Sequence, residues 1–224
     1  MEQADKLVKN EKIKLAGIAT REKHASMTCK SYVVKIDKSH LSKTKSDFLK
    51  SVFREAKWLY NYQLSIDVSD IDDKIKEVTV LNKDREPETK ELTTLSSHMK
   101  QELIARTLMN IAALRQSKKA GNKVGKLKYK SQVNSIPLKQ YNKTYKVNAK
   151  SIKVQGCKKP FKVEGLDQIP IGADLTTATL IHELGDYYIR ITCFIPPVIK
   201  QVTGKSIGLD FGIKDNITTS EGDK

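Results

Sequence analysis

One carboxylate, Asp210, stands between glycines on a short apolar segment near the end of the printed sequence. Residues 205–215 read Lys-Ser-Ile-Gly-Leu-Asp-Phe-Gly-Ile-Lys-Asp, a pattern typical of a buried strand that holds its aspartate at a fixed point. The flanking glycines leave room for a phosphate or a metal ion close to the backbone. The pattern therefore predicts a carboxylate at Asp210 that could bind a metal ion.

A site with a single carboxylate is incomplete for phosphodiester hydrolysis. Paired Mg²⁺ ions that cleave a phosphodiester need several acidic ligands, supplied by separate elements. Only nine residues follow Asp215 in the printed sequence, so we expect the other ligands of such a site to lie beyond it. A structural aspartate, satisfied by backbone donors in a buried strand, is the alternative interpretation of Asp210.

The net charge of +15 is concentrated in one stretch of the chain. Residues 103–163 contain no Asp or Glu but hold two arginines and fourteen lysines, a charge of +16. The other 163 residues carry 25 basic and 26 acidic side chains. Solvated lysine-rich surfaces usually interleave acids, whereas an acid-free run with Tyr, Ser, Asn and Gln suits phosphate, sugar and base contacts. We therefore expect this stretch to bind nucleic acid and not a membrane.

The expected nucleic-acid contacts come from this stretch and from one helical residue before it. For any single lysine, surface solubility is the alternative. The candidates are Arg106, Arg115, Lys118, Lys119, Lys123, Lys126, Lys128, Lys130, Lys139, Lys143, Lys146 and Asn61. Near Asn61, the side chains of Trp58, Tyr60 and Tyr62 could pack in a core or stack on bases, and the spacing of Trp58 and Tyr62 on one helix side favours packing.

Cysteine usage and the amino terminus suggest a cytosolic protein. Cys29, Cys157 and Cys193 are widely separated and form no C-x-x-C pair, which argues against a disulfide framework or a zinc site in this stretch. We expect them to be reduced packing residues. No basic, apolar leader and no apolar run of membrane-spanning length is present, so we expect a soluble, cytoplasmic chain.

Hydrophobic periodicity predicts an α+β fold in which a small β-barrel is interrupted by helices. Alternation predicts a strand over 27–38, and helical spacing predicts helices after Thr44 and after Ser96 or Ser97, the second ending near Gly121 and Gly125. The polar stretch 65–92 reads as a linker or weak helix. Further strands are expected at 133–139, 144–149, 151–155, 161–163, 177–183 and 187–195. The first strand has no neighbour of its own, so we expect it to join this barrel across the helical insertion.

These elements divide the chain into four predicted regions. Residues 1–26 are polar and charged and read as a mobile lead-in. The barrel comprises 27–40 and 126–200, and the helical insertion comprises 41–125. Residues 201–224 begin a further domain with the Asp210 strand.

Four segments, which follow the same order along the chain as in the family, resemble one family: the TnpB proteins of IS200/IS605-type transposons and the related miniature type V CRISPR effectors. Residues 207–216, Ile-Gly-Leu-Asp-Phe-Gly-Ile-Lys-Asp-Asn, are similar to the first RuvC motif of that family. Residues 185–192 resemble the hairpin that precedes this motif, residues 126–131 the basic entry to the barrel, and residues 58–62 the helix after the first strand. The resemblance spans roughly residues 27–224.

This resemblance implies an RNA-guided DNA-binding protein whose full-length form is a Mg²⁺-dependent RuvC-type DNA endonuclease of prokaryotic, transposon-associated or CRISPR origin. It implies that the barrel is a wedge-like domain, that the helical insertion is a recognition lobe, and that residues 201–224 begin an RNase H-like nuclease domain. The implied partners are a guide RNA and target double-stranded DNA, with a homodimer left open. Asp210 would be the first catalytic, metal-binding carboxylate, and the family's remaining catalytic acids and zinc-ribbon cysteines would lie beyond Lys224.

Two alternatives to this function stay open. One is a truncated or nuclease-dead relative that acts as an RNA-guided DNA-binding repressor, or a general RNA-binding protein without catalysis. The other is an ATPase, since sugar kinases, actins and Hsp70-type ATPases bind nucleotide phosphate with a similar strand. Those proteins usually place Thr or Ser after the second glycine, where this chain has Ile213, and carry the motif at the amino terminus.

Overall fold

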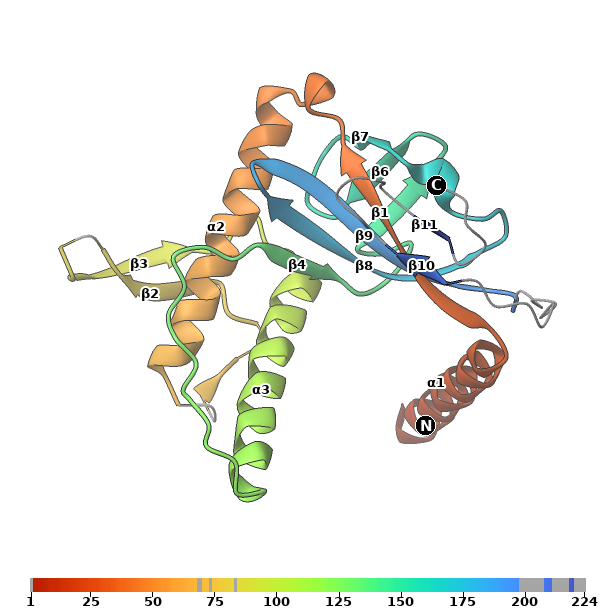
Figure 1. Ribbon diagram of the computed structural model, residues 1–224. Coiled ribbons are helices and arrows are strands. Elements are labelled where there is room, and N and C mark those ends of the chain that lie inside the picture. The colour runs from red at the N-terminus through yellow and green to blue at the C-terminus, as the bar shows by residue number, and fades with distance from the viewer. Residues whose placement is uncertain are drawn as a thin grey trace.

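The computed structural model describes residues 2–67, 70–72, 74–82, 84–197, 208–210 and 218–219 (Figure 1). The elements of the first half are α1 (Glu2–Ala25), β1 (Thr28–Ile36), η1 (Lys38–His40), α2 (Lys43–Ser65), β2 (Glu77–Leu81), β3 (Pro87–Glu91) and α3 (Ser97–Lys119). Those of the second half are β4 (Ser135–Leu138), β5 (Tyr145–Asn148), β6 (Ser151–Val154), β7 (Phe161–Glu164), η3 (Leu166–Gln168), β8 (Asp174–Glu183), β9 (Asp186–Ile195), β10 (Leu209–Asp210) and β11 (Thr218–Thr219).

Among the described residues, seven antiparallel strands form a nearly closed, barrel-like sheet in the order β4-β8-β9-β1-β7-β6-β5. β1 pairs with β9 from Thr28↔Ile195 to Lys35↔Tyr188, and its end pairs with β7 at Ile36↔Val163. β8 and β9 form the long hairpin expected from their alternating sequence. The prediction that the first strand joins the barrel across the helical insertion is therefore confirmed.

One hydrophobic core is shared by the barrel and the helices. The inward face of β1 contributes Val34 and Ile36, both at most 1% exposed, because alternate residues of a strand point to the same side. Leu49, Val52 and Ala56 repeat at helical spacing on α2 and are fully buried in the same cluster. The helical insertion is therefore packed onto the barrel and shares its interior.

Helices α2 and α3 begin and end close to where the sequence predicts. The Ser96 hydroxyl accepts a hydrogen bond from the Met99 backbone N–H and caps α3. After α3, Gly121 has a φ of 84°, which suits glycine because it lacks a Cβ. The N-cap of α2 is Ser42, one residue before the helix and two before the predicted capping signal at Thr44.

A buried carboxylate ties α2 to the segment that leads into α3. Glu55 is 4% exposed, and its two carboxylate oxygens accept hydrogen bonds from the backbone N–H groups of Thr94 and Leu95, at 2.9 Å each. The Thr93 hydroxyl donates a further bond of 3.4 Å. A buried carboxylate needs such donors, because removing a charged group from water without hydrogen-bond partners costs free energy. The start of α3 is thereby held against the middle of α2.

The prediction of a linker or weak helix over residues 65–92 was wrong in its second half, where β2 and β3 form a hairpin. Val78 is 1% exposed and Val80 is half-buried, so the two valines follow the alternation of a strand. The Asn82 side chain accepts hydrogen bonds from two backbone N–H groups of the turn. Abundant charged residues obscured this alternation, and Pro87 starts a strand, a position at which proline is tolerated.

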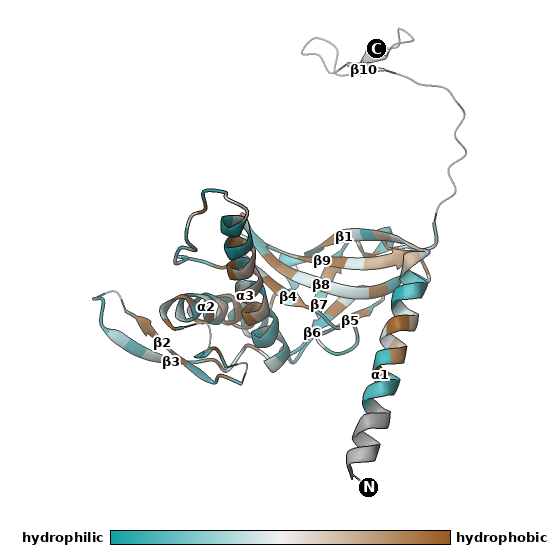
Figure 2. Ribbon diagram, turned by 90° about the horizontal axis from the view of Figure 1, so that it is seen from below, coloured by the Kyte–Doolittle hydropathy of each residue, from teal (hydrophilic) through white to brown (hydrophobic). Residues whose placement is uncertain are grey.

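The predicted mobile lead-in over residues 1–26 also differs from the structure, because Glu2–Ala25 form one helix, α1. Its sequence is rich in Lys, Ala and Glu, which favour helix even where few apolar side chains are available for packing. Figures 1 and 2 show α1 projecting from one end of the barrel. Ile13 and Leu15 are 62% and 61% exposed on it.

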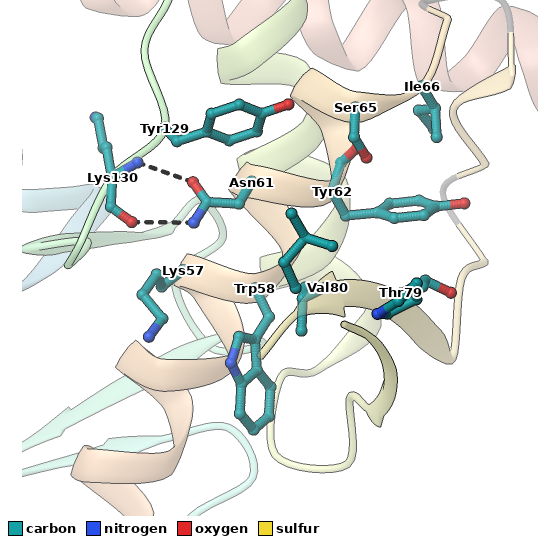
Figure 3. A pocket seen from close by; sticks show the side chains of 12 residues that line it. Lys57, Trp58, Asn61, Tyr62, Ser65, Ile66, Thr79, Val80, Tyr129 and Lys130 are labelled. Atoms are coloured by element: carbon teal, nitrogen blue, oxygen red, sulfur yellow. Dashed lines mark hydrogen bonds between the residues drawn. The ribbon is translucent and has the colours of Figure 1, made fainter. Parts of the chain in front are cut away.

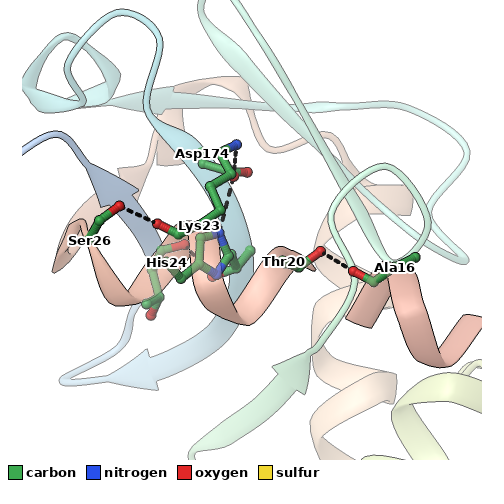
Figure 4. A network of polar contacts seen from close by, with 8 residues as sticks. Ala16, Thr20, Lys23, His24, Ser26 and Asp174 are labelled. Carbon is green, nitrogen blue, oxygen red and sulfur yellow. Dashed lines mark hydrogen bonds and ion pairs between the residues drawn. The ribbon is translucent and has the colours of Figure 1, made fainter. Parts of the chain in front are cut away.

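The last residues of α1 anchor the helix to the barrel (Figure 4). Lys23 Nζ lies 2.7 Å from Asp174 Oδ2, and His24 Nε2 lies 3.1 Å from the same oxygen. The His24 ring stacks on Phe194 of β9 with 3.8 Å between ring centroids. Hydrogen bonds from Lys23 and His24 lower the pKa of the Asp174 carboxyl. The carboxylate is therefore held in the charged form that this contact uses.

A second polar cluster joins the end of β1 to β7. The Asp37 carboxylate accepts bonds from the Ser39 backbone N–H at 2.9 Å and from the Ser39 hydroxyl, and lies 2.7 Å from His40 Nδ1. Lys162 Nζ of β7 lies 3.4 Å from the same carboxylate. The bonds from Ser39, led by its hydroxyl, and the nearby His40 lower the pKa of the Asp37 carboxyl from 3.8 to about 2.

Replacing Asp37 with Asn should reduce the acid dependence of stability. The pKa is lower in the folded chain, so the carboxylate's contribution is complete above pH 3.8 and is lost as the pH falls toward about 2. Because Asn does not titrate, the difference in free energy of unfolding between parent and Asp37→Asn should shrink over this interval. Urea denaturation at about pH 6 and about pH 2 measures this difference. A difference of the same size at both pH values would contradict the prediction.

Candidate nucleic-acid interface

An irregular basic loop, residues 120–134, connects α3 to β4 and runs back along α2 (Figure 1). With the last two turns of α3 it presents exposed cationic side chains without an acidic residue between them. The members are Arg115, Lys118, Lys119, Lys123, Lys126, Lys128 and Lys130. Seven of the twelve predicted contact residues therefore lie on one continuous segment, whose exposed side chains we call the basic loop surface.

The side chain of Asn61 on α2 clasps this loop. Asn61 Oδ1 accepts a 2.9 Å hydrogen bond from the Lys130 backbone N–H, and Asn61 Nδ2 donates a 3.0 Å bond to the Lys130 carbonyl (Figure 3). Next to it, the Tyr60 hydroxyl donates a 3.3 Å bond to the Lys128 carbonyl, and Lys130 Nζ lies 4.6 Å from the Tyr60 ring centroid. These contacts form what we call the Asn61 clasp.

In the clasp, the polar groups of Asn61 and Tyr60 bond to the basic loop. Both polar ends of the Asn61 amide bond to backbone groups, an arrangement in which Asn61 positions the loop. Partial burial raises the pKa of the Tyr60 hydroxyl, which keeps it protonated as a donor. The sequence pattern predicted Asn61 as a direct base or phosphate contact and carried no signal of this positioning role.

Two other predicted contacts, Arg106 and Lys139, take part in interactions within the fold. Arg106 Nη1 donates to the Ser135 carbonyl at 3.2 Å and lies 3.0 Å from the Ser135 hydroxyl. Burial lowers the pKa of the Arg106 guanidinium, and nearby Glu102 opposes this effect. Lys139 Nζ forms a 2.9 Å ion pair with Glu102. Both cations therefore help to hold α3 against β4.

The remaining predicted contacts, Lys143 and Lys146, are exposed on the barrel, before and on β5. They do not belong to the loop that the Asn61 clasp holds. The predicted set is thus divided among the basic loop surface, the α3–β4 junction and the barrel.

Two pockets flank the clasped segment, and Lys130 lines both. The larger, of about 580 Å³, lies between α2, the β2–β3 hairpin and the loop, and we call it the aromatic pocket (Figure 3). The smaller, of about 280 Å³, is lined by Tyr60, by Arg106 and Asn110 of α3, and by Gln132 and other residues of the loop. Among the residues that the structure describes, no carboxylate lines either pocket, so both favour anionic or neutral ligands.

The predicted metal ligand, Asp210, lies in β10, and its backbone pairs with Thr218 of β11. Its side chain and residues 211–217 are outside what the structure describes, so the metal prediction remains a prediction. In the described part of the chain, no group of three His, Cys, Asp or Glu side chains could hold a metal ion. Likewise, no helix there is long and apolar enough to cross a membrane.

The three cysteines are separate thiols. Cys157 and Cys193 are buried, as expected for packing residues, and burial raises the pKa of each thiol. Cys29 is exposed at the start of β1, which differs from the packing role that we expected for it.

Replacing Asn61 with Ala should loosen the basic loop. Losing the two hydrogen bonds to Lys130 should cost about 1 kcal/mol, equivalent to about a fivefold increase in local opening. Trypsin should therefore cut at Lys128 and Lys130 about five times faster, as followed by mass spectrometry under native conditions. Asn110→Ala, at an exposed position of α3, is the matched control and should leave the cleavage rate unchanged. Equal cleavage of the parent and Asn61→Ala would contradict the clasp.

Comparison of the chain with protein-family models and with curated proteins gives no match.

Proposed function

We propose that this chain binds nucleic acid through the basic loop surface and that it belongs to an RNA-guided DNA-binding protein. The observation that carries the proposal is an acid-free cationic surface on a loop that a specific clasp holds in place. Cations that only aid solubility need no fixed position. Cations that bind along a phosphate backbone bind more tightly when their loop is already held in place, because less conformational entropy is lost on binding. The guide RNA would supply sequence recognition, and the protein would bind RNA and heteroduplex by shape and phosphate.

The RuvC part of the proposal rests on Asp210 and on the resemblance of residues 207–216. In a complete protein, Asp210 would be one of several carboxylates around Mg²⁺, which activates water and stabilises the leaving oxygen. One carboxylate supplies part of such a site, and the resemblance implies that other segments of the complete protein would supply the remaining acids. A binder without catalysis, the alternative left open, shares the basic loop surface and lacks those acids.

Removing charge from the loop should weaken RNA binding and reduce its salt dependence. Lys123, Lys126 and Lys128 are exposed, so changing all three to Gln should leave the fold intact. If each contacts a phosphate of single-stranded RNA, the slope of log affinity against log salt should fall by about 2. Fluorescence anisotropy of a labelled RNA over a salt series measures this slope.

The matched control removes three exposed lysines elsewhere, Lys12, Lys14 and Lys50. This variant has the same net charge as the loop variant, so it separates a localised interface from a general effect of charge. It should keep most of the parent slope. Equal loss in both variants, or a flat salt dependence of the parent, would contradict a nucleic-acid interface at the basic loop surface.

Asp210 is tested in the complete protein. Asp210→Ala should remove Mg²⁺-dependent DNA cleavage and leave RNA and DNA binding unchanged. The proposed role of the carboxylate is to bind the metal ion, whereas the basic side chains bind the phosphates. Plasmid cleavage and band-shift assays with the same preparation measure the two properties. Retained cleavage would refute the assignment, and loss of ATP-agarose retention in this variant would favour the ATPase alternative.

A further inference from the structure

The aromatic pocket has walls of two chemical kinds. Trp58 and Tyr62 of α2 and Val80 of β2 supply aromatic and aliphatic surface, and Tyr129 of the basic loop closes one end (Figure 3). Trp58 lies at the opposite end in this view. Lys57 and Lys130 lie along one side of the pocket. A volume of about 580 Å³ is within the range of sites that hold ligands of nucleotide size.

Tyr129 is available for stacking. Its side chain is 65% exposed, while the next residue is fixed to α2 by the two hydrogen bonds of the Asn61 clasp. An exposed aromatic ring contributes little to folding stability through burial, but its free face can stack on a flat ligand. Trp58 is less available, because Arg54 and Lys90 lie 5.5 and 5.7 Å from its ring centroid. Tyr129 is therefore the stacking partner, and Trp58 lines the far end.

The charges around the pocket select the ligand class. Of the residues that the structure describes, twelve line it, two of them lysines and none a carboxylate. An apolar peptide would fill the aromatic surface without using the lysines, and an isolated phosphate would use the lysines without the aromatic surface. A nucleotide uses both, because its base stacks and its phosphate is anionic.

We infer that the aromatic pocket holds one unpaired nucleobase of single-stranded RNA, stacked on Tyr129, with the adjoining phosphate at Lys57 and Lys130. A base inside a duplex is already stacked and paired, so it cannot enter a pocket walled by α2 and the β2–β3 hairpin. The inference rests on the proposed nucleic-acid binding and adds to it a specific nucleotide site. It also gives the β2–β3 hairpin a function as the wall of that site.

The test uses Trp58, the one tryptophan of the chain, as a reporter inside the pocket. The chain is titrated with a short adenine-only RNA and, separately, with a fully paired RNA duplex of equal length. The single strand should change the Trp58 fluorescence and the duplex should leave it unchanged. Tyr129→Ala should weaken single-strand binding by about 5- to 150-fold and leave duplex binding unaltered. Tyr129→Phe keeps the aromatic face and should restore single-strand affinity.

The outcomes separate this inference from the proposed function. If Tyr129→Ala binds the single strand as the parent does and Trp58 fluorescence does not respond, the inference fails while salt-dependent binding survives. If the parent binds neither RNA, both fail. If an apolar dye occupies the pocket and single-stranded RNA does not displace it, the pocket serves an apolar ligand and the inference is overturned. Because Tyr129 is exposed, its replacement should not unfold the chain, which circular dichroism checks.

Discussion

Pairing of β1 on both of its edges is the interaction on which the rest of the described structure depends. β1 joins β9 on one side and β7 on the other, and so unites the β4-β8-β9 and β7-β6-β5 strands in one sheet. It comes from the start of the chain, whereas its partners follow the helical insertion. Pairing of such distant segments closes a long loop, so α2, the hairpin and α3 must all emerge from one end of β1 and return to β4.

Helix α2, packed on this sheet, holds the candidate interface in place. Its apolar face is buried in the shared core, and its remaining positions hold neighbouring segments by hydrogen bonds. Glu55 fixes the segment before α3, and Asn61 fixes the basic loop after it. Trp58 and Tyr62 line the aromatic pocket beside the β2–β3 hairpin. One helix thus positions both the cationic surface and the cavity next to it, which a binding site requires.

Much of the barrel could be predicted from the sequence, because alternation and turn residues are local signals. The strands at 133–195 and the membership of β1 follow from them, as do the bounds of α2 and α3. Helix α1 and the β2–β3 hairpin could not be predicted in this way. In α1 helix propensity prevails over the lack of a clear apolar face, and in the hairpin two valines among many charges carry the pattern.

The site was predictable in its charge and not in its geometry. Composition alone located the cationic stretch, and seven of its exposed cations belong to the basic loop surface. Composition could not show that Arg106 bonds to Ser135 within the fold while other cations of the stretch are exposed to solvent. Nor could it show that the Asn61 amide bonds to Lys130, when a direct contact with nucleic acid was expected. It suggested that the tyrosines of this stretch suit nucleic-acid contacts but did not single out Tyr129, since its position depends on the clasp, a contact between residues 69 apart in the chain. Such roles depend on tertiary contacts, which periodicity does not encode.

RNA carried through purification from cells tests the central claim most directly. The chain is purified at moderate salt, and the RNA that accompanies it is sequenced. RNA-guided binding predicts one dominant, structured RNA species with a variable end. A heterogeneous mixture, or no RNA, would contradict that account and would mean that the basic loop surface gives only nonspecific affinity.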